Sequence, residues 1–473
     1  MPADPAPPAP QTRHPLSHEL RAAALAVELL EQGQRLALGI EVAARRFGLQ
    51  GVSRAALQDI AFVTVRRLGL CKALAARLNR KAPPPAMAAL QWVALAQLIE
   101  RDERSQAPKP GDDRPLRHSA VIVDQAVEAA LLPEPAAGAV PFLNATLRRF
   151  LRERPALMAQ AGTDPDALWN FPRWWVDLLR RDHPDQWQQI LQHSNVAPGL
   201  TLRVNLRRIS LGDYRQRLQA AGWASEPVGP AALQLARSTD VTHLPGFAEG
   251  LISVQDAGAQ LAAYLLDAQA GERILDACAA PGGKAAHLLE TVDCRLTALD
   301  IDPDRIARVS QNLDRLGLAA DIVAGDARYP GKWWDGTLFN KILVDAPCTA
   351  SGIVRRHPDV RWLRRRSDLA TLCARQAEML AALWPLLKPG GKLLYATCSV
   401  FRAEGEERIA RFTADRPDVQ RLPLAWRWSA DGPLETVSQL LPRSRQRGSL
   451  MAADGREARD HDGFYYALLQ KPP

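Results

Sequence analysis

The sequence has few cysteines and lacks the cysteine patterns that hold a metal or a disulfide framework. No Cys-x-x-Cys pair occurs, and no histidines are spaced as zinc ligands. These absences argue against a zinc site and against a disulfide-rich secreted scaffold, so we expect reduced thiols. The six cysteines are Cys71, Cys278, Cys294, Cys348, Cys373 and Cys398.

Long apolar runs and a secretory signal are also missing. The longest candidate for a membrane span, residues 86–99, is interrupted by Gln91 and Gln97. It falls short of the roughly 18 apolar residues that a span needs, so we expect a buried helix. The first 15 residues are rich in proline and alanine and have no basic start followed by an apolar core. They predict a disordered leader, and the chain is expected to stay in the cytoplasm.

The chain is long enough for several domains and carries a positive charge. Its 473 residues exceed the ~250 to 300 at which single cores stop growing. The formal charge of +8 favours a polyanionic partner such as RNA. Residues 1–160 hold 21 Lys and Arg against 15 Asp and Glu, an excess of 21 − 15 = +6. A basic accessory domain is therefore predicted before residue 160.

Two regions precede the predicted catalytic part. Apolar residues recur at helical spacing through residues 16–160, which predicts an all-helical domain broken near residues 83–85 and 105–115. Residues 161–250 mix helical segments with short strand-like pieces near 200–205 and 233–236, which predicts a small α+β module. This module is either a linker or an RNA-guiding platform, and the platform would use Arg203, Arg207 and Arg208.

Strand and helix patterns alternate from residue 251 to residue 473, as in a Rossmann-like α/β domain with a doubly wound parallel sheet. A last strand at 463–469 is expected to close an edge. The helices expected between the strands include 284–292 and 303–316. The five parallel strands are predicted at 273–277, 295–299, 320–323, 341–345 and 392–395.

Ligands of an open parallel sheet bind beyond the carboxyl ends of its strands, where a nucleotide-type cofactor site is predicted. Asp300 ends the second strand and suits the ribose hydroxyls, whereas Asp302 is expected to cap the next helix. Asp326 follows the third strand, where it either accepts from an adenine amino group or is a turn residue. The loop after the first strand consists of Cys278, Ala279, Ala280, Pro281, Gly282, Gly283 and Lys284.

Two thiols follow the fourth and fifth strands, Cys348 in Asp-Ala-Pro-Cys and Cys398 in Thr-Cys-Ser. A thiolate that adds to C6 of a cytosine makes C5 nucleophilic enough to take the methyl group of S-adenosylmethionine. Asp345 is placed to touch both cofactor and base. Free cysteine is also often a small core residue, and residue types alone do not order the two thiols.

An arginine-rich segment follows the loop of Cys348, with six arginines and a tryptophan between residues 355 and 366. Such a run is either a solvated helix face or a surface for RNA. Its place directly after a candidate active-site loop favours phosphate contacts and base stacking.

Five stretches occur together and in order: 274–284, 299–302, 345–348, 355–359 and 395–399. With them the chain resembles the Sun/NOL/NOP family of RNA cytosine-C5 methyltransferases. The resemblance covers nearly the whole chain, and residues 16–160 look like a NusB-type RNA-binding domain, most clearly at 142–149. One departure is Thr349, where the family usually has serine; it retains a hydroxyl, so we expect activity to be kept.

The resemblance implies roles for the site residues. S-adenosylmethionine would be bound by the 278–284 loop with Asp300, Asp326 and Asp345. Cys398 would be the nucleophile and Cys348 would assist breakdown of the adduct. The implied substrate is 16S rRNA or a small-subunit assembly intermediate, and the enzyme is expected to be a monomer without a membrane or metal partner. The alternatives are the same chemistry on tRNA or another RNA, a DNA cytosine methyltransferase, and a non-catalytic RNA-binding assembly factor.

Overall fold

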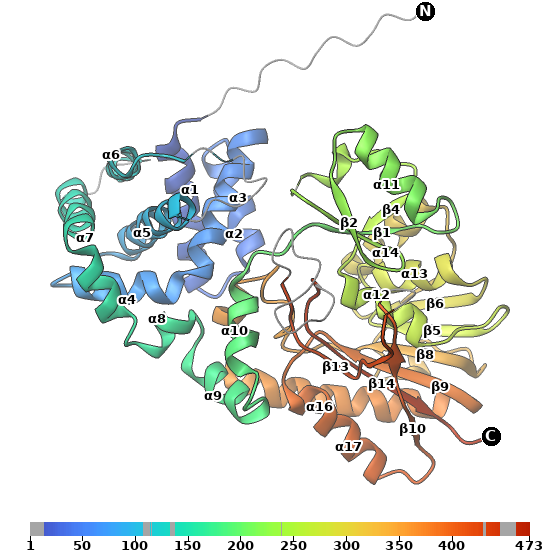
Figure 1. Ribbon diagram of the computed structural model, residues 1–473. Helices are drawn as coiled ribbons and strands as arrows, with labels where there is room; N and C mark the ends of the chain where they lie inside the picture. Colours follow the sequence, from blue (N-terminus) through green and yellow to red (C-terminus); the bar gives the residue numbers. More distant parts are fainter. Residues whose placement is uncertain are drawn as a thin grey trace, which may run out of the picture. The chain divides into compact units, whose positions relative to one another are not determined.

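The computed structural model describes residues 14–473 except 107–113, 115, 133–137, 238, 429–431 and 445–459. Most of the expected leader and of the expected loop at 105–115 therefore lies outside the described residues. The chain folds into two compact units (Figure 1). The first contains Met1–Asp177 with Pro358–Leu363, and the second contains Leu178–His357 with Arg364–Pro473.

Helices make up the first unit. The helix α1 is central because it packs against α2, α3, α5 and α6. Alanines on α1 permit this close packing, and a Cβ on Gly39 of α2 would lie 3.0 Å from the carbonyl oxygen of Ala26. The helices of this region are α1 (Leu16–Glu31), α2 (Leu36–Arg46), α3 (Gly51–Arg66), α4 (Leu68–Leu78), α5 (Pro85–Gln106), α6 (Ser119–Ala129), α7 (Ala139–Ala161) and α8 (Pro165–Trp169).

The apolar stretch at 86–99 is a buried helix, as predicted. It lies within α5, where Leu90, Val93 and Leu98 are fully buried in the helical core. The amides of Gln91 and Asn79 pair with each other at 2.8 and 2.9 Å, which satisfies a polar group inside that core. Among the described residues, no helix is both long and apolar enough to cross a membrane.

Six residues of the arginine-rich segment belong to the first unit. Asp359 accepts from the backbone N–H of Leu36 at 3.1 Å and so caps the start of α2. Arg361 is fully buried, stacks over Phe171 at 3.9 Å and donates to a backbone carbonyl. Trp362 donates to the carbonyl oxygen of Val65 at 3.0 Å. The prediction of RNA contacts is therefore wrong for Arg361 and Trp362, which build the core of the helical unit instead.

A small antiparallel sheet opens the second unit, with strand order β2-β3-β1-β4. Arg203 of β1 is fully buried and pairs with Glu290 at 2.8 Å, so its predicted role in an RNA platform is wrong. Arg207 and Arg208 are exposed. The chain enters the second unit within α9 (Arg173–Asp182). The elements that follow are α10 (Trp187–Asn195), β1 (Thr201–Val204), α11 (Leu211–Ala220), β2 (Ser225–Gly229), β3 (Ala232–Leu235) and β4 (Ile252–Val254).

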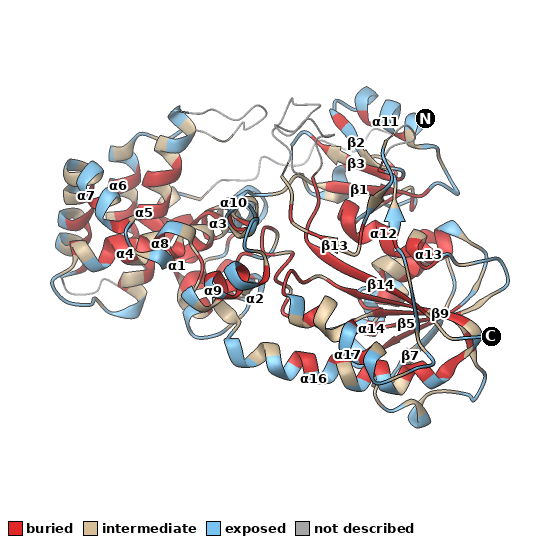
Figure 2. Ribbon diagram, turned by 60° about the horizontal axis from the view of Figure 1, so that its bottom comes forward, coloured by how far each residue is buried: buried red, intermediate tan, exposed pale blue. Residues whose placement is uncertain are grey.

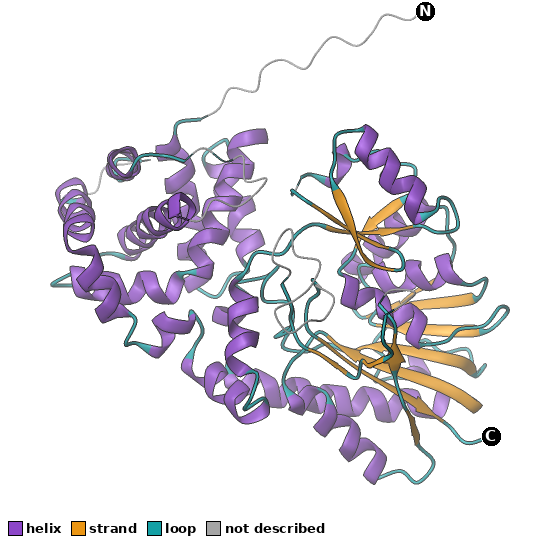
Figure 3. Ribbon diagram, viewed as in Figure 1, coloured by secondary structure: helices purple, strands orange, loops and turns teal. Residues whose placement is uncertain are grey.

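The large sheet has the order β10-β14-β9-β8-β5-β6-β7, and β13 also pairs with β14. Strands β5 to β9 are parallel to one another, whereas β14 is antiparallel to β9. Figure 3 shows helices on both sides of this sheet. The strands are β5 (Arg273–Ala277), β6 (Arg295–Asp300), β7 (Asp321–Ala324), β8 (Phe339–Asp345), β9 (Leu387–Thr397), β10 (Gln420–Leu422), β13 (Gln439–Leu440) and β14 (Phe464–Gln470).

Alternate side chains of each strand reach opposite faces of the sheet. Leu343 of β8 packs into the core under one helical layer, while Ile342 and Val344 pack into the core under the other. Figure 2 shows the central strands of this sheet largely in the colour of buried residues. The first layer contains α12 (Ala257–Leu265), α13 (Gly283–Thr291) and α14 (Pro303–Leu316), and the second contains α16 (Arg366–Leu383) and α17 (Glu406–Ala414).

The predicted strands occur within a few residues of their expected limits, and the parallel sheet is confirmed. The last strand is not an edge, because β10 pairs with its outer side through Gln420, Arg421 and Leu422. Three residues without apolar alternation give no strand signal in a sequence, so this pairing could not be anticipated.

Candidate active site

The loop after β5 turns sharply at the carboxyl edge of the sheet. Cys278 has a φ of 66° and Gly282 a φ of 96°, and Gly282 directly precedes α13. A Cβ at position 282 would lie 3.2 Å from the Val309 side chain and 3.3 Å from its Cα. Glycine is therefore required here both by the backbone and by the close approach of α14.

Gly282→Ala is expected to weaken S-adenosylmethionine binding about tenfold or more, because the loop must move to relieve both strains. Calorimetric titration with the cofactor measures this loss. Gly271→Ala is the matched control, since Gly271 has a φ of 76° and no atom within 4 Å of a built Cβ. Equal loss of affinity in the two variants would contradict the assignment of this loop.

Two acids lie at the end of β6 and serve different purposes. The Asp300 side chain is buried and accepts from the backbone N–H of Ala280 at 3.2 Å, which ties the strand end to the glycine loop. Asp302 accepts from the N–H groups of Asp304 and Arg305 at 2.9 and 3.3 Å. The predicted cap of α14 is therefore confirmed at Asp302.

Asp326, after β7, is held by an arginine. Arg328 forms an ion pair with it at 2.7 Å and also contacts Glu378 at 3.0 Å. The hydrogen bonds from Arg328 lower the pKa of Asp326, so this carboxylate is ionised. Sequence alone gave no indication of Arg328, because an arginine two residues after a turn is common on surfaces.

A buried lysine connects the glycine loop to the end of β8. Lys284 contacts Asp345 at 2.6 Å, and both side chains are largely shielded from solvent. Burial disfavours the ammonium, but the charges of Asp345 and Cys398 outweigh it and raise the pKa of Lys284. The fixed positive charge of Lys284 therefore lies beside the Cys398 thiol. In the same part of the sheet, burial and the charge of Asp345 raise the pKa of Asp276 on β5 well above its ordinary range.

The two predicted thiols meet at adjacent strand ends. The Sγ atoms of Cys348 and Cys398 are 3.3 Å apart, and Cys348 is only 8% exposed. The hydrogen bond with Cys398, burial and the nearby charge of Glu404 together raise the pKa of Cys348 well above its ordinary range. Cys348 therefore remains a protonated thiol near neutral pH.

The loops that carry the thiols are bonded to one another. The N–H of Gly352 donates to the carbonyl oxygen of Cys398 at 2.9 Å. The hydroxyls of Ser351 and Ser399 are 2.8 Å apart. Arg364 donates to the carbonyl oxygens of Cys348 and Thr349 at 3.3 and 3.1 Å. The site is thus rigid, and Arg364 supports the loop rather than a phosphate.

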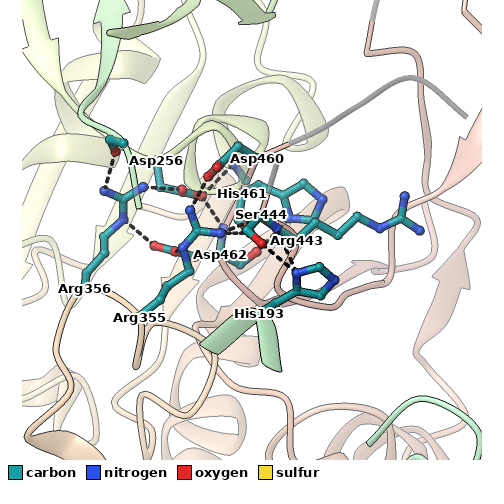
Figure 4. Close-up of polar contacts among 11 residues, drawn as sticks. His193, Asp256, Arg355, Arg356, Arg443, Ser444, Asp460, His461 and Asp462 are labelled. Atoms are coloured by element: carbon teal, nitrogen blue, oxygen red, sulfur yellow. Dashed lines mark hydrogen bonds and ion pairs between the residues drawn. The ribbon is translucent and has the colours of Figure 1, made fainter. Parts of the chain in front are cut away.

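Arg355 and Arg356, which follow the Cys348 loop, form ion pairs, and Arg355 is fully buried (Figure 4). Arg356 contacts Asp256 at 2.7 Å and Asp462 at 2.6 Å. Arg355 lies between Asp462, at 3.2 Å, and Asp460. The prediction of phosphate contacts is wrong for both arginines, because aspartates hold their guanidinium groups. The sequence could not reveal these pairs, because the partners lie about 100 residues away.

Asp462 gives the second unit a pH-dependent stability. Burial and the charge of Asp256 raise the pKa of Asp462 to about 7, although Arg356 and Arg355 oppose the shift. The unfolded carboxyl titrates near 4, so the folded state holds the extra proton between about pH 4 and pH 7. This contribution to the free energy of unfolding is present below pH 4 and is lost as pH rises towards 7.

Asp462→Asn is expected to gain stability relative to the wild type as pH rises from 4 to 7, by at most about 1.4 kcal/mol per pH unit. Urea unfolding at several pH values measures the difference. Asp256→Asn is the contrasting variant: despite its burial, the charge of Arg356 lowers the pKa of Asp256. It should lose stability above pH 4, and the same trend in both variants would contradict the assignment.

The remaining cysteines have structural positions, as their sequence context suggested. Cys71 and Cys373 are buried, and Cys294 is partly buried. Within the described part of the chain, no cluster of His, Cys, Asp and Glu is arranged to hold a metal ion.

The fold and the site together define a Rossmann-like methyltransferase with a helical N-terminal region. Residues 263–470 match the family model "16S rRNA methyltransferase RsmB/F", and residues 171–242 match that of its ferredoxin-like domain. The ribosomal RNA small subunit methyltransferase B of Pseudomonas syringae pv. tomato is 41% identical over 425 residues, covering 88% of this chain and 89% of the relative. That of Serratia proteamaculans is 36% identical over 478 residues, covering 96% and 99%.

The chain therefore belongs to the RsmB/F family of 16S rRNA methyltransferases, and it is an S-adenosylmethionine-dependent rRNA methyltransferase. A methyltransferase homologue from Pyrococcus horikoshii, 27% identical, has a TM-score of 0.52 and covers 65% of this chain and 97% of its own. NSun6 from the same organism, solved with the S-adenosylmethionine analogue SFG, is 17% identical with a TM-score of 0.51 and shares the fold.

Proposed function

We propose that the protein methylates C5 of a cytosine in 16S rRNA through a covalent adduct between Cys398 and C6 of the base. The 3.3 Å separation of the Cys398 and Cys348 sulfurs at two parallel strand ends carries this proposal. A single nucleophile needs one thiol, whereas making and breaking an adduct benefits from two. The positive charge of Lys284 interacts with Cys398 and so lies beside the proposed nucleophile.

The two thiols have different roles in the proposed reaction. The Cys398 thiolate adds to C6, which leaves C5 nucleophilic towards the methyl group. After methylation solvent water accepts the C5 proton, the electrons of that C–H bond form the C5–C6 double bond again, and the C6–S bond breaks to release the Cys398 thiolate. The pKa of Cys348 is raised, so its thiol stays protonated and can donate a hydrogen bond to the departing sulfur. This is the order that the family resemblance implies, and the raised pKa of Cys348 supports it.

The strand ends offer a donor and acceptor set that fits the cofactor. Asp300 would accept from the ribose hydroxyls, and Asp326 would accept from the adenine amino group. The loop from Cys278 to Lys284 would surround the methionine part, and the start of α13 would favour its carboxylate. S-adenosylmethionine supplies an electrophilic methyl group. Asp345, held by Lys284 at 2.6 Å, would orient the target base beside it.

We further propose that residues 16–160 form a NusB-like RNA-binding domain, with 161–250 as an intermediate module and 251–473 as the catalytic domain. Arg148 and Arg152 of α7 are exposed and offer phosphate contacts. We expect a monomer that acts in the cytoplasm on 16S rRNA or on a small-subunit assembly intermediate.

The test is methyl transfer from labelled S-adenosylmethionine to protein-free 16S rRNA, assembled small subunits, tRNA and a DNA copy of the rRNA. Digestion to nucleosides should recover 5-methylcytidine from the rRNA sample and none from the DNA. Recovery of another methylated nucleoside would reject the C5 chemistry. Transfer to tRNA alone would reject the substrate, and transfer to none of the four would favour a non-catalytic factor.

A further inference from the structure

A buried carboxylate that the steps above do not use joins the two thiol loops. Glu404 is fully buried on a short 3-10 turn, η4 (Arg402–Glu404), after β9. One carboxylate oxygen accepts from the N–H of Thr349 at 2.8 Å, and the other accepts from the Thr349 hydroxyl. The latter also accepts from the Ser399 hydroxyl at 2.7 Å. Thr349 directly follows Cys348, and Ser399 directly follows Cys398.

The surrounding bonds fix Glu404 itself. Tyr395 donates to its backbone carbonyl at 2.9 Å, and the Gln376 amide donates to its side chain at 3.3 Å. The same Gln376 nitrogen donates to the carbonyl oxygen of Pro347 at 3.0 Å, one residue before Cys348. A rigid acceptor is therefore held between the residues that follow the two thiols.

Burying this acid has a cost that the fold does not require. Burial raises the pKa of Glu404, while hydrogen bonds from Thr349 and Ser399 lower it. Those bonds come from a backbone N–H, two hydroxyls and an amide, all of them neutral. An apolar side chain would fill the same space without desolvating a carboxylate, but it could not accept these hydrogen bonds, so a buried acceptor here indicates a positioning role.

We propose that Glu404 is a positioning residue that fixes the separation of the Cys348 and Cys398 sulfurs without contacting the substrate. This inference rests on the proposed two-thiol reaction. Glu404 accepts hydrogen bonds from the residue after each thiol, so replacing Glu404 by a side chain without an acceptor lets the two loops move independently. Thr349 retains a hydroxyl where the family usually has serine, and this hydroxyl is one of the groups that Glu404 holds.

The test compares Glu404→Ala with Glu404→Gln in two measurements. A glutathione redox buffer measures the effective concentration of the two thiols for each other: two thiols and one glutathione disulfide give one protein disulfide and two glutathione thiols. Single-turnover methylation measures the chemical step. Glutamine can accept from the Thr349 N–H and donate to the two hydroxyl oxygens, so it preserves these hydrogen bonds without the charge.

For Glu404→Ala we expect the effective concentration to fall at least tenfold and the single-turnover rate about 100-fold, with the S-adenosylmethionine Kd and the KM for rRNA within about twofold. Glu404→Gln should keep both measurements within about threefold of wild type. Glu407→Ala, three residues along the same segment and partly exposed, is the matched control and should match wild type.

Wild-type values in Glu404→Ala, or a Glu404→Gln variant as impaired as Glu404→Ala in both measurements, would overturn the positioning role. If Glu404→Ala does not fold, Thr349→Val provides the same test, because it removes one hydroxyl that is bonded to Glu404. Thr349→Ser keeps that hydroxyl and should have the wild-type effective concentration and single-turnover rate. The thiol measurement needs no RNA. It therefore separates failure of this inference from failure of the proposed reaction, which would appear as a wild type that makes no 5-methylcytidine.

Discussion

Replacing Cys398 by alanine is expected to reduce methyl transfer to 16S rRNA by at least about 10⁴-fold, to the background of the assay. The neighbouring Cys348 is not expected to replace the sulfur, because it is a protonated thiol with a raised pKa. The variant should also form no covalent RNA complex. Filter-binding assays with labelled cofactor measure the rate, and denaturing gels detect the complex.

Cys398→Ala should still bind its ligands normally. Its side chain is only partly buried, so truncation removes little packing, and the cofactor loop lies on a different strand end. S-adenosylmethionine affinity and the melting temperature are therefore expected to match wild type. A variant that retains more than a hundredth of the wild-type rate with a normal fold would contradict the nucleophile assignment.

Replacing Cys348 by alanine is expected to slow turnover about 100-fold or more and to trap the enzyme on its product. The first half of the reaction uses only Cys398, so methylation of one base per enzyme should proceed. Release should fail because the donor that lies 3.3 Å from the departing sulfur is gone. A denaturing gel should show a persistent protein–RNA band that wild type lacks.

Cys348→Ser is the informative companion of this variant. A hydroxyl still donates a hydrogen bond, so partial release is expected, with a weaker trapped band than for Cys348→Ala. Cys373→Ala, a buried cysteine that bonds to a backbone carbonyl, controls for loss of a thiol elsewhere. A trapped band in Cys398→Ala instead of Cys348→Ala would reverse the two roles.

The sequence predicted most of the catalytic domain because its signals are local. The limits of β5 and α14 agree with prediction to the residue, since Asp302 and Pro303 mark a helix start and apolar runs mark the strand. The two thiols could be placed at one edge because parallel strands share their carboxyl ends. Their order could not be obtained from residue types, and it rests on the family resemblance.

The errors arose where partners are distant in the sequence. Arg355, Arg356 and Arg361 have the composition of an RNA surface, yet each donates to a residue more than 100 positions away. A charge run gives no sign of such partners, so the solvated and the buried arrangements look alike. Glu404 was missed for the same reason, since nothing local distinguishes it from the nearby Glu406 and Glu407.

The most direct measurement is peptide mapping of the complex trapped by Cys348→Ala. After digestion with nuclease and protease, mass spectrometry should find a methylated cytidine attached to the peptide that contains Cys398. A nucleotide on any other residue, or a Cys348→Ala enzyme that turns over normally without a complex, would contradict the proposed covalent chemistry.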